Sequence, residues 1–173
     1  MSRLNREAIL ASLMVLLSVG LVVRLAPYFR QYNVQAGDRA PAFNLTADDG
    51  SGLRLEDFRG KYVLLNFWAT YCVPCIEELP SLNGVYEDMR DKGLVVLGIS
   101  VDTDDTAYKE FLQAHRVAFP VVRDPEWSVA LRYGTSKIPE TYLIDKEGVV
   151  LRKYVNFQDW QRPEIVNYLQ SLL

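Results

Sequence analysis

The sequence predicts an α/β fold in which a β-sheet is sandwiched between helices in three layers, preceded by a transmembrane helix. Short apolar runs of strand composition alternate with segments that carry apolar residues at steps of three and four, which predicts the sandwich. An uncharged apolar run at residues 8–23 predicts the transmembrane helix. With 173 residues, 49% of them hydrophobic and 24% charged, the chain suits one domain plus an extension.

Residues 1–26 have the pattern of an uncleaved signal anchor. The run at 8–23 follows two arginines, and at about 1.5 Å per residue it spans ~24 Å. Snorkelling of Arg24 would extend the span to about 28 Å, close to the ~30 Å hydrocarbon core of a bilayer. A polar linker is expected at 27–36, before a domain at 37–173.

Two alternatives to the anchor remain. Ser18-Val19-Gly20 is a weak small-x-small site at which a cleaved signal peptide would end, and a soluble amphipathic helix is the third interpretation. Both the anchor and the cleaved signal would export the domain. Arginines lie on both sides of the apolar run, so the positive-inside rule leaves the orientation open.

Charge is distributed unevenly along the chain. Residues 1–30 carry four arginines and one glutamate, a net charge of +3, and the remaining 15 basic and 21 acidic residues give −6, so that the whole chain has −3. An acidic domain is a poor binder of nucleic acid, so no nucleic-acid partner is expected.

The first part of the domain leads to its two cysteines. Asp48–Gly52 predicts a hairpin turn, Leu53–Leu55 a short strand and Lys61–Asn66 an apolar strand. Cys72 and Cys75 follow, with two residues between them, and a helix pattern begins after them. Unpaired N–H groups and a partial positive charge at a helix N-terminus favour a thiolate, the reactive form of cysteine. The spacing also allows the two cysteines to close a disulfide.

The rest of the chain continues the alternation. An aspartate run at 102–105 is expected to begin a helix as a solvated capping segment, in preference to a metal site. The predicted elements are a buried strand at 93–101, this helix, a short strand at 119–122, a helix at 126–133, a hairpin of strands at 141–144 and 149–155, and a closing helix at 163–172.

The cysteine motif resembles a known family. Trp-Ala-Thr-Tyr-Cys-Val-Pro-Cys at 68–75, with Glu78 and Pro80 after it, resembles the active site of thioredoxin-like proteins, and most closely the membrane-anchored TlpA/ResA/DsbE group of bacterial thiol–disulfide oxidoreductases. The likeness covers about residues 37–173. It implies a thioredoxin-like sandwich with an N-terminal strand extension and a central insertion at roughly 94–118. It also implies that the N-terminus lies in the cytoplasm.

The resemblance assigns roles around the cysteines. Cys72 would attack a substrate disulfide and Cys75 would resolve the mixed disulfide. A substrate-binding rim would comprise Trp68, Tyr71, Val73 and Pro74, although Trp68 is also a candidate for packing and Tyr71 replaces the tryptophan usual in the family. Ile138-Pro139 would supply a cis-proline facing the pair, where an extended substrate can lie along the Ile138 backbone.

An acid–base group is expected on the helix. Thioredoxin itself carries a buried aspartate six residues before its first cysteine, and Asn66 occupies that position here. Glu78 lies three residues after Cys75 and would share its helix face. A desolvated carboxylate there would have a raised pKa and could relay the Cys75 proton. The alternative is a solvated glutamate like Glu77.

The predicted function is an extracytoplasmic thiol–disulfide oxidoreductase in the bacterial inner membrane. The resemblance implies protein disulfide substrates such as apocytochrome c or its maturation factors, and a membrane protein as electron donor. No cofactor or metal is expected. A peroxiredoxin-like peroxidase is one alternative, although Leu65 and Ala69 stand where its proline and threonine or serine belong. A Cu(I) chaperone is the other, with Met14, Met89 and His115 as the remaining soft ligands.

Overall fold

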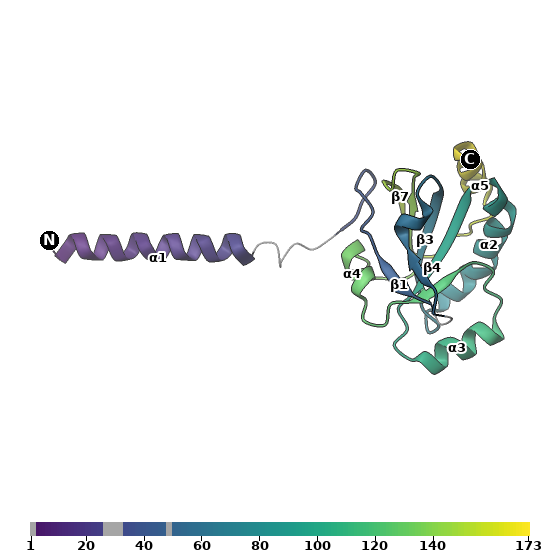
Figure 1. Ribbon diagram of the computed structural model, residues 1–173, viewed down its shortest axis with the longest axis horizontal. Coiled ribbons are helices and arrows are strands. Elements are labelled where there is room, and N and C mark those ends of the chain that lie inside the picture. The colour runs from purple at the N-terminus through teal and green to yellow at the C-terminus, as the bar shows by residue number, and fades with distance from the viewer. Residues whose placement is uncertain (1–2, 26–32, 48–49) are drawn as a thin grey trace. The chain divides into compact units, whose positions relative to one another are not determined.

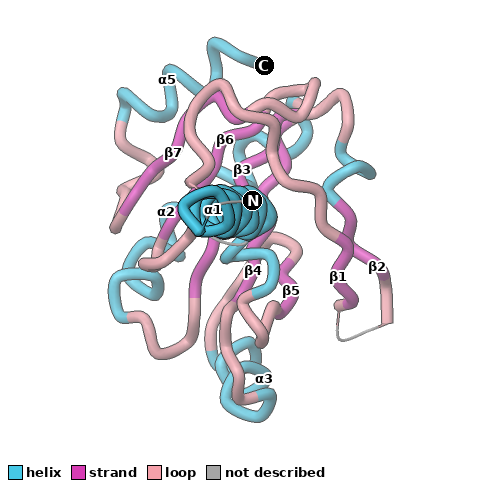
Figure 2. Tube along the Cα trace, turned by 90° about the vertical axis from the view of Figure 1, so that its left-hand side faces the viewer, coloured by secondary structure: helices cyan, strands magenta, loops and turns pink. Residues whose placement is uncertain are grey.

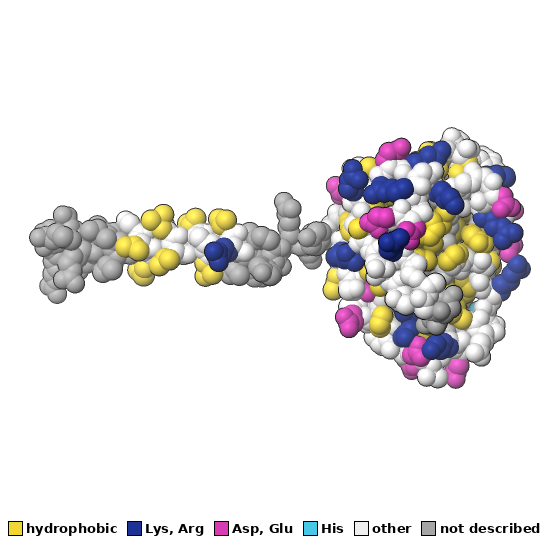
Figure 3. All heavy atoms as spheres, viewed as in Figure 1, with side chains coloured by type: hydrophobic (Ala, Val, Ile, Leu, Met, Phe, Trp, Pro, Cys, Tyr) yellow, Lys and Arg dark blue, Asp and Glu magenta, His cyan; other side chains and the backbone are white. Residues whose placement is uncertain are grey.

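The computed structural model describes residues 3–25, 33–47 and 50–173. The chain divides into two units, Met1–Gln31 and Tyr32–Leu173. In the first unit, α1 (Arg3–Leu25) is a helix over the predicted apolar run. Its large hydrophobic side chains between Leu13 and Val23 are 51% to 71% exposed (Figure 3).

The membrane anchor predicted at 1–26 stays a prediction. Over the part of the chain that the structure describes, no helix is both long enough and apolar enough to cross a bilayer. Most of the predicted linker at 27–36 and two residues of the predicted turn at 48–52 lie outside the described residues.

A five-stranded mixed sheet forms the centre of the second unit. Its strand order is β5-β4-β3-β6-β7; β3 is parallel to β4, and β4 to β5, whereas β6 is antiparallel to both β3 and β7. A separate hairpin pairs β1 with β2 (Figure 2). The strands are β1 (Asn44–Thr46), β2 (Gly52–Arg54), β3 (Tyr62–Trp68), β4 (Leu94–Ser100), β5 (Val121–Arg123), β6 (Glu140–Ile144) and β7 (Val150–Val155).

Helices cover both faces of this sheet, as the sequence predicts. Figure 1 shows α2 and α5 on one side of the strands and α4 on the other, so the domain has three layers. The α-helices are α2 (Val73–Met89), α3 (Asp105–Ala114), α4 (Ser128–Tyr133) and α5 (Pro163–Leu172), and short 3-10 turns occupy η2 (Leu55–Phe58) and η3 (Arg90–Lys92).

Several element boundaries differ from the prediction by one or two residues, and two of these differences have a clear cause. Strand β3 continues two residues beyond Asn66, because Phe67 and Trp68 are buried and still pair with β4. Helix α4 begins at Ser128 and not at Glu126. Asp124 causes the later start, because its carboxylate accepts hydrogen bonds from the first N–H groups of the helix and fixes where the helix begins.

The topology brings three segments to one edge of the sheet. Parallel strands β3 and β4 end at the same edge, and the antiparallel strand β6 begins there, with Phe67 of β3 paired to both Ile99 and Glu140. The cysteine turn after β3, the loop after β4 and the proline before β6 therefore lie close together.

Candidate active site

The two cysteines form a disulfide at the start of α2. Their Cα atoms are 5.3 Å apart and the sulfur atoms are bonded. Strand β3 ends at Trp68, and a turn follows in which the Cys72 N–H donates to the Ala69 carbonyl at 3.2 Å. Cys72 is the N-cap of α2 and Pro74 lies in the first turn, where proline needs no N–H partner. The predicted strand–turn–helix context of the pair is confirmed.

Exposure distinguishes the two sulfur-bearing residues. Cys72 is 8% exposed and Cys75 is 1% exposed, so the first cysteine is the more accessible, as its position before the helix predicts. Tyr71 and Val73 are 65% and 63% exposed, and Pro74 is also exposed. These three residues form an exposed apolar surface beside the disulfide, and their role in substrate binding stays a prediction.

Trp68 does not belong to that surface. Its side chain is 1% exposed, and its ring packs against Tyr108 and Phe111 of α3 with centroids 6.2 and 5.4 Å away. The assignment of Trp68 to substrate binding is therefore wrong, and its packing role is the correct one. The reason is that Tyr108 and Phe111 of α3 cover the indole.

The Ile138–Pro139 peptide bond is cis, as the second motif predicts. Ile138 is half-buried and Pro139 is buried. Pro139 precedes β6, and its carbonyl accepts a hydrogen bond from the Asn156 N–H at 3.0 Å. Because Glu140 pairs with Phe67, Pro139 lies level with the end of β3 and thus beside the cysteine turn.

The residue after this proline anchors its loop. The Glu140 carboxylate is 4% exposed and accepts hydrogen bonds from Thr135 at 2.7 Å and from the Tyr142 hydroxyl. The Lys153 ammonium of β7 lies 3.2 Å away. These contacts tie both ends of the 135–140 segment to the sheet.

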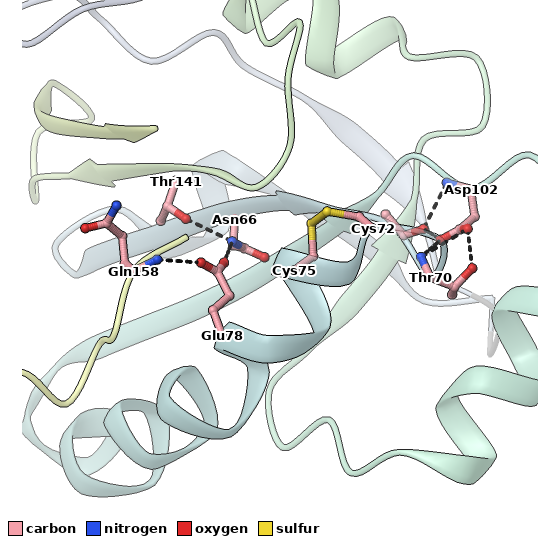
Figure 4. Close-up of a disulfide and its surroundings, with 9 residues drawn as sticks. Asn66, Thr70, Cys72, Cys75, Glu78, Asp102, Thr141 and Gln158 are labelled. Atoms are coloured by element: carbon pink, nitrogen blue, oxygen red, sulfur yellow. Dashed lines mark hydrogen bonds between the residues drawn. A yellow bond between two sulfur atoms is a disulfide. The ribbon is translucent and has the colours of Figure 1, made fainter. Parts of the chain in front are cut away.

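Glu78 lies in a buried polar cluster next to the disulfide. It is 2% exposed, whereas its neighbour Glu77 is exposed, so it is not a solvated helix residue. One carboxylate oxygen accepts from the Asn66 amide at 2.8 Å and the other from the Gln158 backbone N–H at 3.1 Å (Figure 4). Burial raises the Glu78 pKa to about 7, although these hydrogen bonds oppose the rise. A carboxyl with this pKa can exchange a proton near neutral pH.

Asn66 connects the helix acid to the cis-proline strand. Its amide nitrogen donates both to Glu78 and, at 2.9 Å, to the Thr141 hydroxyl. Figure 4 places Asn66 between Glu78 and Cys75. An amide supplies donors and does not ionise, so the strand holds the carboxyl in place without adding a second charge.

Sequence reasoning missed another buried carboxylate near the cysteine turn. Asp102 is 2% exposed and not solvated as predicted, and it accepts hydrogen bonds from Thr70 and Ser100 (Figure 4). Only Asp104 of the predicted capping run caps α3. The position of Asp102 directly after a buried parallel strand is the signal that indicates it. Gln158 carries no such signal, because it contributes a backbone N–H.

The candidate metal ligands are dispersed. Among the described residues, no group of three or more histidine, cysteine, aspartate or glutamate side chains is arranged to hold a metal ion. His115 is exposed and stacks on Phe111, and Met89 is buried near the far end of α2.

Known proteins share this architecture. The AhpC/TSA family matches residues 36–153. The thiol–disulfide oxidoreductase ResA of Geobacillus kaustophilus is 34% identical over 167 residues, covering 96% of this chain and 94% of that protein. ResA of Bacillus cereus is 31% identical over 170 residues, or 97% of each chain.

A solved structure supports the same fold. A protein assigned as the thiol:disulfide interchange protein DsbE of Chlorobium tepidum superimposes with a TM-score of 0.71 at 31% identity, covering 81% of this chain and 96% of that one. The thioredoxin-like fold predicted from the sequence is confirmed.

Proposed function

The chain belongs to the AhpC/TSA family and to the ResA family of thiol–disulfide oxidoreductases, and on that premise we propose that it reduces protein disulfides outside the cytoplasm through Cys72 and Cys75. The observation that carries the proposal is the Cys72–Cys75 disulfide, which lies at a helix N-terminus beside the cis-proline and a buried carboxyl with a pKa of about 7.

The reaction starts from the reduced pair. The Cys72 thiolate attacks one sulfur of a substrate disulfide, the substrate S–S bond breaks, and a mixed disulfide forms as one substrate thiolate leaves. The Cys75 thiolate then attacks the Cys72 sulfur, which releases the second substrate thiol and forms the Cys72–Cys75 bond. Two electrons pass to the substrate, and a dithiol donor restores the pair by the reverse exchange.

Glu78 serves this second step. Cys75 must lose its proton before it attacks, and Glu78 lies one helical turn further along the same helix. Because burial raises its pKa to about 7, ionised Glu78 can take that proton at neutral pH. Asn66 and the Gln158 backbone hold the carboxylate in position through the hydrogen bonds described above.

A polypeptide substrate fits the surroundings of the disulfide. Tyr71, Val73 and Pro74 offer exposed apolar contacts on one side. On the other side, the segment with the cis Ile138–Pro139 bond lies beside the pair, directly before β6. Such a surface suits an unfolded segment that carries a disulfide.

We base the substrate and the electron donor on the resemblance of the cysteine motif to the TlpA/ResA/DsbE group. Apocytochrome c or its maturation factors would supply the substrate disulfide, and a membrane protein would return the electrons. The exposed apolar side chains of α1 support a location at a membrane, since contiguous apolar surface of this kind marks contact with lipid or another protein. The catalytic domain would then face the extracytoplasmic side.

Partner trapping tests the proposal. Cys75→Ser cannot resolve the mixed disulfide, so the full chain expressed in a bacterial membrane should accumulate covalent partners that dithiothreitol releases. Cys72→Ser is the matched control, because it keeps one thiol but removes the proposed nucleophile. Equal trapping by the two variants, or none by Cys75→Ser, would refute the mechanism.

A peroxidase is the alternative that the AhpC/TSA match raises. The two positions that would carry its proline and hydroxyl residue hold Leu65 and Ala69, both fully buried apolar residues. We therefore expect no consumption of hydrogen peroxide above that of the Cys72→Ser variant.

A further inference from the structure

A buried carboxylate lies on the Cys72 side of the disulfide, away from Glu78 (Figure 4). Asp102 follows β4, and β4 is the parallel neighbour of β3, so the loop after β4 reaches the turn that carries Cys72. The side chain is 2% exposed. A buried carboxylate is costly unless its oxygens are hydrogen-bonded, so its partners indicate what it does.

Those partners belong mainly to the cysteine turn. The Thr70 N–H lies 3.0 and 3.2 Å from the two Asp102 oxygens, and the Thr70 hydroxyl donates at 2.6 Å. The Ser100 hydroxyl at the end of β4 donates at 2.6 Å. Asp102 therefore links the last residue of one strand to the turn that follows its neighbour.

Thr70 occupies the middle of that turn. The Cys72 N–H closes the turn by donating to the Ala69 carbonyl at 3.2 Å, and Val101 ties β4 to the Trp68 carbonyl at 2.9 Å. The strand end is thus held by backbone contacts. The turn itself is held to the loop after β4 through the carboxylate of Asp102, which fixes Thr70 through both its backbone and its side chain.

We propose that Asp102 is a positioning residue for the nucleophile: by fixing Thr70 it sets the direction in which Cys72 presents its sulfur to an incoming disulfide. The inference rests on the proposed function, in which Cys72 makes the first attack. Thiol–disulfide exchange requires the attacking sulfur to approach along the S–S bond, and errors of about 1 Å in placement can cost up to about 100-fold in rate.

The test uses a small aromatic disulfide that releases a coloured thiolate. The full chain is reduced, and single-turnover rates are measured above the thiol pKa values, where removal of the Asp102 charge no longer changes the ionised fraction. Asp102→Ala removes both carboxylate oxygens that accept hydrogen bonds from Thr70 and Ser100, and we expect Cys72 to react about tenfold more slowly. Asp102→Asn keeps the shape and one acceptor oxygen, and it should stay within about threefold of the parent.

A matched control separates position from stability. Asp124 is 1% exposed and accepts four hydrogen bonds from Ser128, Val129 and Ala130 at the start of α4. Asp124→Ala should lower the free energy of unfolding by a similar amount yet leave the rate with the reagent unchanged. An unchanged rate in Asp102→Ala, or an equal loss in Asp102→Asn, would overturn the proposal.

A second pair of variants tests the same proposal if Asp102→Ala does not fold. Thr70→Val removes only the hydroxyl donor to Asp102, whereas Thr70→Ser keeps it. We expect the valine variant alone to react more slowly, and equal rates would again refute the proposal. The reagent reacts with any accessible thiolate, so these results are valid even if trapping finds no protein substrate. The positioning role of Asp102 and the proposed reduction of protein disulfides can therefore be refuted independently of each other.

Discussion

Replacing Glu78 with glutamine should change how the stability of the protein depends on pH. Burial raises the Glu78 pKa from 4.5 to about 7, and each tenfold difference in proton affinity between the folded and unfolded states is worth about 1.4 kcal/mol. Ionised Glu78 therefore destabilises the folded state by about 3 kcal/mol. Below pH 4.5 Glu78 is protonated in both the folded and the unfolded state, so it costs no stability. As the pH rises from 4.5 through about 7, the free energy of unfolding falls by this amount.

Glutamine has the size of glutamate but does not titrate. It replaces one of the two accepting oxygens with a donor, so either the Asn66 amide or the Gln158 N–H loses its partner. That loss costs about 1–3 kcal/mol at every pH. The absolute stability of Glu78→Gln is therefore less informative than the way its free energy of unfolding changes with pH. The variant should not show the parent's decrease of about 3 kcal/mol between pH 4.5 and 8.

Urea unfolding of the oxidised protein at several pH values measures this slope. Glu77→Gln is the control, because it removes the same charge one residue away from an exposed position and should follow the parent. If the curves of the parent and Glu78→Gln run parallel from pH 4.5 to 8, the carboxyl does not titrate in this range and the reasoning fails.

The reduced form of the same variant tests the proton transfer. Without the neighbouring negative charge, the thiol pKa values of Cys72 and Cys75 should fall, because nothing opposes their ionisation. Resolution by Cys75 should nevertheless slow, because its proton acceptor is gone. Thiol titration by ultraviolet absorbance and single-turnover exchange measure the two effects. If neither changes, the acid–base role of Glu78 is wrong.

Three further predictions concern the cysteines, the polar cluster and the N-terminus. Limited alkylation of reduced protein, followed by peptide mapping, should label Cys72 before Cys75, and the opposite order would reverse their roles. Asn66→Asp would place two carboxyls within hydrogen-bond distance, so the pair should hold a proton above pH 7. Urea unfolding at pH 8 should therefore give the variant a free energy of unfolding about 1–3 kcal/mol lower than that of the parent. N-terminal sequencing of protein isolated from membranes should begin near residue 1, whereas a start near Leu21 would show that the segment is cleaved.

The sequence predicts the arrangement of strands and helices well, because it depends on local patterns. The central strands β3 and β4 are almost wholly apolar runs, and the long helices repeat apolar residues at the helical period. The disulfide and the cis-proline also follow from local motifs. Trp68 shows the limit: its indole is buried because Tyr108 and Phe111 of α3, about 40 positions later in the chain, pack on it, and no local pattern contains that contact.

The state of Glu78 depends on contacts that no local pattern contains. Its helix position follows from the spacing to Cys75, but its burial requires residues about 80 positions later to close over it, where Gln158 donates its N–H. Asp102 is similar, because its partners Thr70, in the turn after β3, and Ser100, at the end of β4, come together only when the two strands pair in the folded sheet.

The identity of residue 66 then becomes understandable from the geometry. Its side chain lies 2.8 Å from Glu78, so a carboxylate at both positions would force one of the two to stay protonated at neutral pH. Asparagine avoids that conflict and supplies two donors, one to the acid and one to Thr141. The ionisable group is thereby confined to the helix, one turn after Cys75, where its proton affinity acts most directly on the resolving thiol. On this argument, moving the acid back to the strand with Asn66→Asp and Glu78→Gln together should restore a titrating carboxyl but not the native rate of resolution.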